Sequence, residues 1–269
     1  MDELMICVAP HPGERRERLI KKLNVPEEVF RSYNEGASIV HLHVRDETGK
    51  QVVDPTFFRK QIQAIRSLCP IIIEGSTGGT TEHTLEERAV SLTVPGIEMG
   101  SLNMGSINMN GGVYRNPLHE IRFYAKKMKA RKIKPFFYIF DLSMFHNVLR
   151  LKGEGLFSPP YVYGFIFDIQ DGLPFHKKYL NFFIEELPKG ALWFLLRHHS
   201  RGWKDFREAL ERGGHVRVGF EDSPFLSSGK RATSNAELVK EIVKAAKAVG
   251  RKVVGPERTR EILGIKGPK

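Results

Sequence analysis

The stretch "SIVHLHVRD" (38–46) decides the fold, because it places two imidazoles inside an apolar, β-branched run. Side chains alternate along a strand, so His41 and His43 share one face and the apolar residues around them share the other. A polar group on a buried face needs a partner. The pattern therefore predicts a strand whose outer face packs against helices and whose inner face carries a polar function.

Similar apolar runs recur along the chain and alternate with helix-like segments. Strands are expected at 4–9, 38–44, 71–76, 97–101, 134–140, 163–169, 192–197 and 215–221, and helices at 26–36, 54–68, 117–130, 233–250 and 256–263, among others. Eight strands alternating with helices over about 250 residues predict a TIM (β/α)8 barrel, here as one domain spanning residues 1–269. A doubly wound open sheet is the rival, but no G-x-G-x-x-G motif follows the first strand.

Composition limits the classes of protein to which the chain can belong. Its 269 residues carry a formal net charge of +11, and 41% of them are hydrophobic. No apolar run approaches the roughly 20 residues that span a bilayer, and no signal segment is evident, so we expect a cytoplasmic protein with no membrane partner. Cys7 and Cys69 have no spacing typical of a disulfide framework or a thiolate metal site. The positive charge indicates either an anionic partner or a solvated basic surface, and no motif for binding nucleic acid accompanies it.

Two histidines on one strand face are well placed to hold a metal ion. A third ligand is expected in "HVRVGFED" (215–222), where a strand ends in Glu221 and Asp222. In a barrel the eighth strand is two places from the second, which brings Glu221 towards the histidines. Arg217 shares the inner face and can fix a neighbouring carboxylate. The alternatives are a pair of core histidines with satisfied hydrogen bonds and an acid pair in a turn before a proline.

A glycine-rich segment, "EGSTGGTTEHT" (74–84), follows the third expected strand. Backbone NH groups in such a loop can cradle an anion, although glycine-rich turns are common. Ser101 stands at the end of the next expected strand. Both sites lie where a barrel enzyme binds its substrate.

Together these motifs resemble the β-keto acid cleavage enzymes, over most of the chain. The resemblance is carried by "GASIVHLHVRDETG" (36–49), "IIIEGSTGGT" (71–80), "GSLNMGSIN" (100–108) and "GGHVRVGFED" (213–222). It implies a TIM barrel with one divalent metal, usually zinc, held by His41, His43 and Glu221. It implies the reaction of a β-keto acid with acetyl-CoA to give acetoacetate and a new acyl-CoA. It also suggests a homo-oligomer, often a tetramer.

The implied reaction suits the residues at the expected mouth of the barrel. A metal would polarise the keto oxygen. Asp222, beside Arg217, is the candidate general base for forming the enolate that adds to the thioester. The residues expected to hold the substrate carboxylate and the developing oxyanion are Ser76, Gly78, Gly79 and Ser101.

The chain departs from the family pattern on the fifth expected strand. Where relatives often carry two acids, "PFFYIFD" (135–141) has Phe136 and Tyr138. Tyr138 cannot neutralise an ammonium group at neutral pH, so we predict a substrate with a neutral or anionic side chain. Tyr138 is assigned to substrate binding, with ordinary barrel packing as the alternative. His11, in "APHPG" (9–13), is also expected near the mouth.

Two other classes of function remain open at this level. A metal-dependent hydrolase of the amidohydrolase kind also uses H-x-H in a TIM barrel, but on the first strand and with histidines on later strands. Here "LMICVA" (4–9) precedes the pair, and His146 and His176 fall in helix-like or turn contexts. A basic barrel that binds nucleic acid would show a steep salt dependence and hold no metal.

Overall fold

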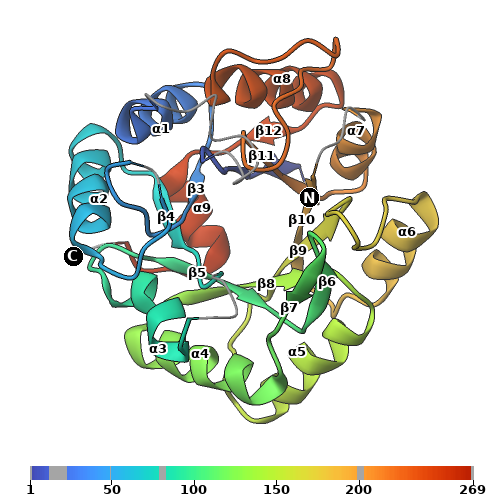
Figure 1. Cartoon of the computed structure of the whole chain (residues 1–269). Coiled ribbons are helices and arrows are strands. Elements are labelled where there is room, and N and C mark those ends of the chain that lie inside the picture. Colours follow the sequence, from blue (N-terminus) through green and yellow to red (C-terminus); the bar gives the residue numbers. More distant parts are fainter. Residues whose placement is uncertain (1, 12–22, 49, 79–82, 199–202, 268–269) are drawn as a thin grey trace.

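The computed structural model describes residues 2–11, 23–48, 50–78, 83–198 and 203–267. At its centre eight parallel strands form a closed barrel in the order β10-β11-β2-β3-β4-β5-β8-β9 (Figure 1). The barrel strands are β2 (Ile6–Val8), β3 (Ile39–Leu42), β4 (Ile72–Gly75), β5 (Met99–Asn103), β8 (Lys134–Ile139), β9 (Val162–Phe167), β10 (Leu192–Arg197) and β11 (His215–Val218). The predicted TIM-barrel fold is therefore confirmed.

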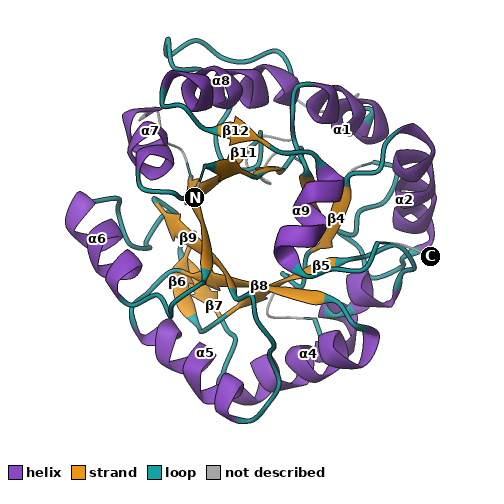
Figure 2. Ribbon diagram, turned by 180° about the vertical axis from the view of Figure 1, so that it is seen from behind, coloured by secondary structure: helices purple, strands orange, loops and turns teal. Residues whose placement is uncertain are grey.

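Helices surround the barrel and close one of its ends. They are α1 (Val25–Asn34), α2 (Thr56–Leu68), α3 (Leu85–Arg88), α4 (Leu118–Arg131), α5 (Ser143–Gly153), α6 (Lys177–Glu185), α7 (Trp203–Glu211), α8 (Asn235–Ala248) and α9 (Pro256–Leu263). Seen from behind, α9 lies over the central opening (Figure 2). Its Arg260 binds the Glu98 carboxylate and the Pro70 carbonyl, which precede β5 and β4. Helix α9 thus covers the N-terminal end of the barrel, and the C-terminal end is left for the site.

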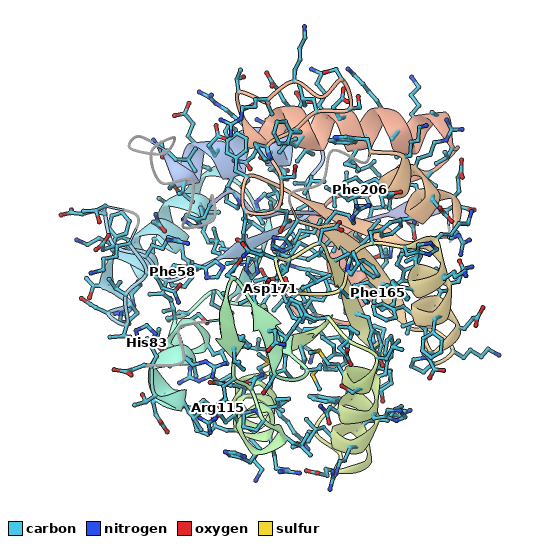
Figure 3. All side chains as sticks on the ribbon, turned by 45° about the vertical axis from the view of Figure 1, so that its right-hand side comes forward. Phe58, His83, Arg115, Phe165, Asp171 and Phe206 are labelled. Carbon is cyan, nitrogen blue, oxygen red and sulfur yellow. The ribbon has the colours of Figure 1, made fainter. Side chains whose placement is uncertain are left out.

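The side chains of the strands separate into an inner and an outer set. Inside the barrel, Phe194 packs against Phe136 and His215, with ring centroids 4.9 Å and 5.0 Å apart. Outside it, Phe165 of β9 packs against Phe183 of α6 at 5.1 Å, and Figure 3 labels Phe165 on its strand. This alternation is the physical basis of the period-two pattern in the sequence.

Some expected boundaries differ from the structure. The expected strand 4–9 divides into β1 (Glu3–Leu4), which pairs with β12 (Lys252–Val253), and the barrel strand β2. The expected strand 215–221 stops at Val218, because Gly219 turns the chain with a φ of +152°. An antiparallel hairpin, β6 (Ile107–Met109) and β7 (Gly112–Tyr114), was not predicted, although its Asn110-Gly111 turn is a common hairpin signal.

Candidate metal and acyl-transfer site

Three neighbouring strands bring the predicted site residues together. Strand β11 pairs with β2, and β2 pairs with β3. His41 lies on β3, His43 lies one residue beyond its end, and Glu221 follows the turn after β11. The amide of Glu221 donates to the carbonyl of Ala9 at 3.2 Å, which fixes this turn against the end of β2. The predicted neighbours, the eighth, first and second expected strands, are β11, β2 and β3, and they lie in this order in the barrel.

The turn requires glycine at position 219. A Cβ atom there would lie 2.1 Å from the Ala9 carbonyl oxygen, far inside normal contact. The carbonyl of Gly219 also accepts from the amides of Asp222 and Ser223. Gly219 therefore lets the segment carrying Glu221 fold closely over β2.

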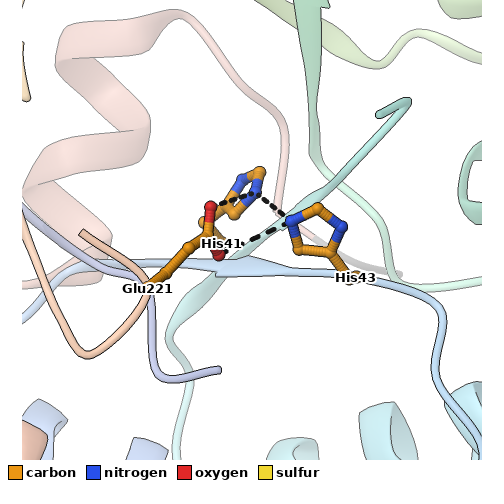
Figure 4. Close-up of side chains that lie close together, drawn as sticks. All are labelled: His41, His43 and Glu221. Carbon is orange, nitrogen blue, oxygen red and sulfur yellow. Dashed lines mark hydrogen bonds and ion pairs between the residues drawn. The ribbon is translucent and has the colours of Figure 1, made fainter. Parts of the chain in front are cut away.

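The atoms of His41, His43 and Glu221 converge on a small volume (Figure 4). The two Nε2 atoms are 3.3 Å apart. The carboxylate oxygens of Glu221 lie 3.6 Å from Nε2 of His41 and 3.5 Å from Nε2 of His43. A tetrahedral site with bonds of about 2.0–2.2 Å has ligand-to-ligand edges of about 3.3–3.6 Å. The triad therefore has the spacing of three ligands around one ion.

The charge states of these groups also suit a cation. Burial lowers the pKa of His43, which favours a neutral ring with a free lone pair. Burial opposes ionisation of Glu221, but Arg217 and the two histidines outweigh it and hold the pKa of Glu221 well below its ordinary value. Nδ1 of His43 and Oε2 of Glu221 are buried and have no hydrogen-bond partner. Oε2 of Glu221, buried without a hydrogen-bond partner and next to two imidazole nitrogens, fits a divalent metal.

Arg217 connects the triad to the candidate base. Its side chain is buried, and its Nε and Nη2 donate to both oxygens of Asp222 at 2.9 Å and 2.7 Å. Nη2 also donates to Glu221 at 2.7 Å, and Nη1 donates to the Tyr138 hydroxyl at 2.8 Å. The planar guanidinium thus fixes Asp222 in one orientation beside the triad. His198, which the sequence analysis did not select, also contacts this carboxylate: its Nε2 lies 3.5 Å from Oδ1 of Asp222.

Glu74 is a further residue that sequence reasoning missed. It lies on β4 directly opposite His41 of β3 and is fully buried. Its carboxylate is 3.1 Å from Nδ1 of His41 and accepts a hydrogen bond from the Tyr138 hydroxyl at 2.9 Å. The signal was a single acid within the apolar run 71–75, on the same strand face as Ser76. Such an acid inside a barrel has to meet a polar partner.

The glycine-rich loop differs in one respect from the expectation. The amide of Ser76 donates to the Leu42 carbonyl, that of Thr77 to the Ser101 hydroxyl and that of Gly78 to the Ser76 hydroxyl. These amides are therefore already paired, so the expectation of a backbone cradle for an anion is wrong for residues 76–78. Gly79 lies outside the described residues.

Ser76 and Gly78 nevertheless lie beside the triad. A Cβ atom on Gly78 would be 3.1 Å from the Ser76 hydroxyl oxygen and 3.8 Å from Cε1 of His43. Ser101 contacts this loop through Thr77: its hydroxyl accepts from the Thr77 amide, and its carbonyl accepts from the Thr77 hydroxyl. The loop thus places the small Gly78 next to His43 and the Ser76 hydroxyl next to Gly78.

His11 is buried at the end of the segment after β2. Its Nδ1 has no hydrogen-bond partner, and burial, assisted by Arg45 and His43, lowers the pKa of His11 to about 3. By contrast, His146 and His176 are exposed, and His176 caps α6 by accepting from the Lys178 amide. The last two are therefore surface residues, as the sequence contexts indicated.

Comparison with known proteins agrees with this geometry. The family model described as beta-keto acid cleavage enzyme matches residues 21–265. The chain belongs to this family. A 3-keto-5-aminohexanoate cleavage enzyme of Acetoanaerobium sticklandii is 36% identical over 251 residues, covering 90% of this chain and 92% of its own. The corresponding enzyme of Fusobacterium nucleatum is 35% identical over 244 residues, with coverages of 90% and 89%.

A relative with another substrate and a solved structure extend the comparison. The 3-oxoadipate:acetyl-CoA acetyltransferase of Cupriavidus necator is 31% identical and covers 97% of this chain and 94% of its own. The apo structure of ObcA superposes with a TM-score of 0.79 at 16% identity, over 90% of this chain but only 64% of that one, and so supports the fold alone. Membership of the β-keto acid cleavage family supports an enzyme of that class and gives no support to the hydrolase alternative. Among the described helices, none is long and apolar enough to cross a membrane.

Proposed function

We propose that the chain is a metal-dependent acyltransferase that converts a β-keto acid and acetyl-CoA into acetoacetate and a new acyl-CoA. The observation that carries this proposal is the convergence of His41, His43 and Glu221 beside the Arg217–Asp222 pair, in a member of the β-keto acid cleavage family. The triad would hold the metal, with zinc as the first candidate and another divalent ion as the alternative. When bound, the metal would supply a Lewis acid for the keto oxygen of the substrate.

Asp222 would remove the proton between the keto and carboxylate groups of the substrate. Its carboxylate is held by two hydrogen bonds from Arg217, so its orientation is set before the substrate arrives. The substrate carbanion then attacks the acetyl thioester and releases the CoA thiolate. Attack of this thiolate on the original keto carbonyl breaks the carbon–carbon bond and gives acyl-CoA and acetoacetate. Atoms and charge balance in this sequence, and the proton on Asp222 returns to the acetoacetate carbanion.

Substrate binding would rest mainly on side-chain hydroxyls. The hydroxyl of Ser76, beside Gly78, would bind the substrate carboxylate, while Gly78 leaves room beside His43. Ser101 would act by holding Thr77 in place. Gly79, which lies outside the described residues, remains a proposed contact from the sequence. The oxyanion would be stabilised by side-chain hydroxyls, because the described amides of this loop are already paired.

The pocket would favour a substrate with a neutral or anionic side chain. Burial raises the pKa of Tyr138 well above its ordinary value, so the phenol stays neutral. Its hydroxyl is already bonded to Glu74 and Arg217. Glu74 is fully buried, so its charge faces these partners rather than solvent. We infer a preference for a neutral acid or a dicarboxylate, as in the name of the relative from Cupriavidus necator, because the neutral Tyr138 offers no charge to an ammonium group.

Wider expectations about the protein also remain proposals. The net charge of +11 would assist binding of the coenzyme A phosphates. A homotetramer, a cytoplasmic location and one domain over residues 1–269 follow from the resemblance and the composition. Light scattering coupled to gel filtration tests the assembly.

An acyl-exchange screen tests the proposed function. The zinc-loaded protein is incubated with acetyl-CoA and neutral, anionic and cationic β-keto acids, and new acyl-CoA species are identified by mass. We expect exchange with neutral or anionic acids, lost in His41→Ala and Asp222→Asn. Best turnover with an amino-substituted acid would contradict the proposed side-chain preference. No exchange with any acid, in protein shown to hold its metal, would contradict the function itself.

A further inference from the structure

Glu74 is a buried carboxylate that the proposed reaction does not use. It is fully buried within the barrel, where an uncompensated charge would be costly. Its two oxygens contact Nδ1 of His41 and the hydroxyl of Tyr138, with distances of 3.1 Å and 2.9 Å for the closest pairs. Both contacts come from the inner face of the barrel at the level of the triad. The placement of this acid therefore serves the site rather than the packing of the barrel.

The contact with His41 determines which ring nitrogen of His41 is free. A carboxylate at Nδ1 favours the tautomer with its hydrogen on Nδ1, which leaves the lone pair on Nε2. Nε2 of His41 is the atom that lies 3.3 Å from Nε2 of His43 and 3.6 Å from Glu221. We propose that Glu74 is a positioning residue that fixes the tautomer and ring orientation of His41 for metal binding. This inference rests on the metal site of the proposed function.

Tyr138 extends this arrangement to the candidate base. Its hydroxyl donates to Glu74 and accepts from Arg217, which in turn binds Glu221 and Asp222. Glu74 is therefore held from both sides, by the imidazole and by the phenol. Tyr138 therefore takes part in a polar network, in which its hydroxyl is the partner of Glu74 and Arg217.

His41 and His43 differ in the surroundings of their Nδ1 atoms. Nδ1 of His43 is buried without a hydrogen-bond partner, whereas Nδ1 of His41 faces Glu74. Carboxylates that bind the second nitrogen of a metal-bound histidine orient the ring and raise its basicity, and their loss typically weakens metal affinity about 10–100-fold. Removing the Glu74 carboxylate should therefore weaken the binding of a metal by His41.

Metal affinity of the purified protein, measured against a chromogenic chelator, tests the inference without any need for activity. Glu74→Gln keeps the shape of the side chain and removes its charge, and we expect an increase of about 10–100-fold in the Kd for zinc. Glu120→Gln is the matched control, because Glu120 is also buried but binds Arg88 and Arg115 away from the site. The Kd of Glu120→Gln for zinc should equal that of the unmodified protein. Tyr138→Phe, which keeps the contact between Glu74 and His41, should weaken binding less than Glu74→Gln.

A second measurement does not depend on how Glu74→Gln folds. In unmodified, metal-free protein with 15N-labelled histidine, His41 should already carry its hydrogen on Nδ1 because of Glu74, with the signal assigned by its loss in His41→Asn. A hydrogen on Nε2, or an unchanged Kd in Glu74→Gln, would overturn the inference and leave the metal site intact. Failure of the unmodified protein to bind any divalent metal would instead remove the metal site and this inference together.

Discussion

Replacing Gly219 by alanine should damage the site through the backbone alone. The φ of +152° at this position is one that residues with a Cβ rarely adopt, at a cost of about 1–2 kcal/mol. The new Cβ would lie 2.1 Å from the Ala9 carbonyl oxygen, so the two segments must separate by about 0.9 Å to reach even a tight 3.0 Å contact. Overpacking of this kind costs about 1–3 kcal/mol. We therefore expect Gly219→Ala to lower the free energy of unfolding by about 2–5 kcal/mol.

The displacement should also reach the metal ligands. Glu221 follows Gly219 by two residues, and its amide bonds the same Ala9 carbonyl. A misplacement of about 1 Å in a catalytic group can cost about 100-fold in rate, and a ligand moved this far should weaken metal binding at least about 10-fold. Gly250→Ala is the control, because Gly250 has a φ of +74° and a Cβ added there would meet no atom within 4 Å. Gly250→Ala should lower the free energy of unfolding by about 1–2 kcal/mol and leave the metal affinity unchanged.

Guanidinium unfolding and chelator competition on the two variants measure both effects. Equal stabilities for Gly219→Ala and Gly250→Ala, together with unchanged zinc affinity in both, would refute the reasoning from the backbone contact. Loss of stability without loss of metal affinity would show that the turn relaxes away from Glu221.

Three further predictions concern protonation, the metal and the buried arginine. Burial lowers the pKa of His215 to about 3, so the folded protein excludes a proton that the unfolded chain binds below its ordinary pKa of 6.5. The free energy of unfolding therefore falls as the pH drops below 6.5, by up to about 1.4 kcal/mol per pH unit from His215. Urea unfolding at pH 4.5–6.5 should show a smaller pH dependence in His215→Asn, and an unchanged dependence would contradict the role of His215. Removing the metal with a chelator should lower Tm, since free metal at about 1,000 times its Kd adds about 4 kcal/mol, and His43→Ala should abolish this difference in thermal scans. Arg217→Lys should lose the paired hydrogen bonds to Asp222, and we expect it to destabilise the protein by about 3–5 kcal/mol and to reduce kcat. Calorimetry and kinetics that match the unmodified protein would contradict the role of Arg217 in holding Asp222.

Sequence reasoning succeeded where local periodicity and strand order determine the outcome. Alternation placed His41 and His43 on the inner face, and the closing of the barrel placed the segment after Arg217 two strands away. Both conclusions need only the period of a strand and the order of strands in a TIM barrel. The family resemblance, now supported by the family model, agreed with them.

The remaining features depend on contacts between distant residues. Glu74 meets Tyr138 across 64 positions of the chain, and a single acid in an apolar run does not indicate its partner. The amide of Thr77 is occupied by Ser101, from the next barrel strand, so a glycine-rich pattern could not show whether the loop amides are free. The early end of the last strand came from the turn at Gly219, which lies so close to Ala9 that a Cβ atom would not fit.

Isotope tracing of the exchange reaction tests the central proposal most directly. The zinc-loaded protein is given a β-keto acid accepted in the screen together with acetyl-CoA labelled with 13C at both acetyl carbons, and the products are analysed by mass and NMR. The account predicts acetoacetate labelled at its carbonyl and methyl carbons, its other two carbons coming from the keto acid, and an unlabelled new acyl-CoA. Unlabelled acetoacetate, or labelled acetate with no new acyl-CoA, would contradict acyl exchange at this site.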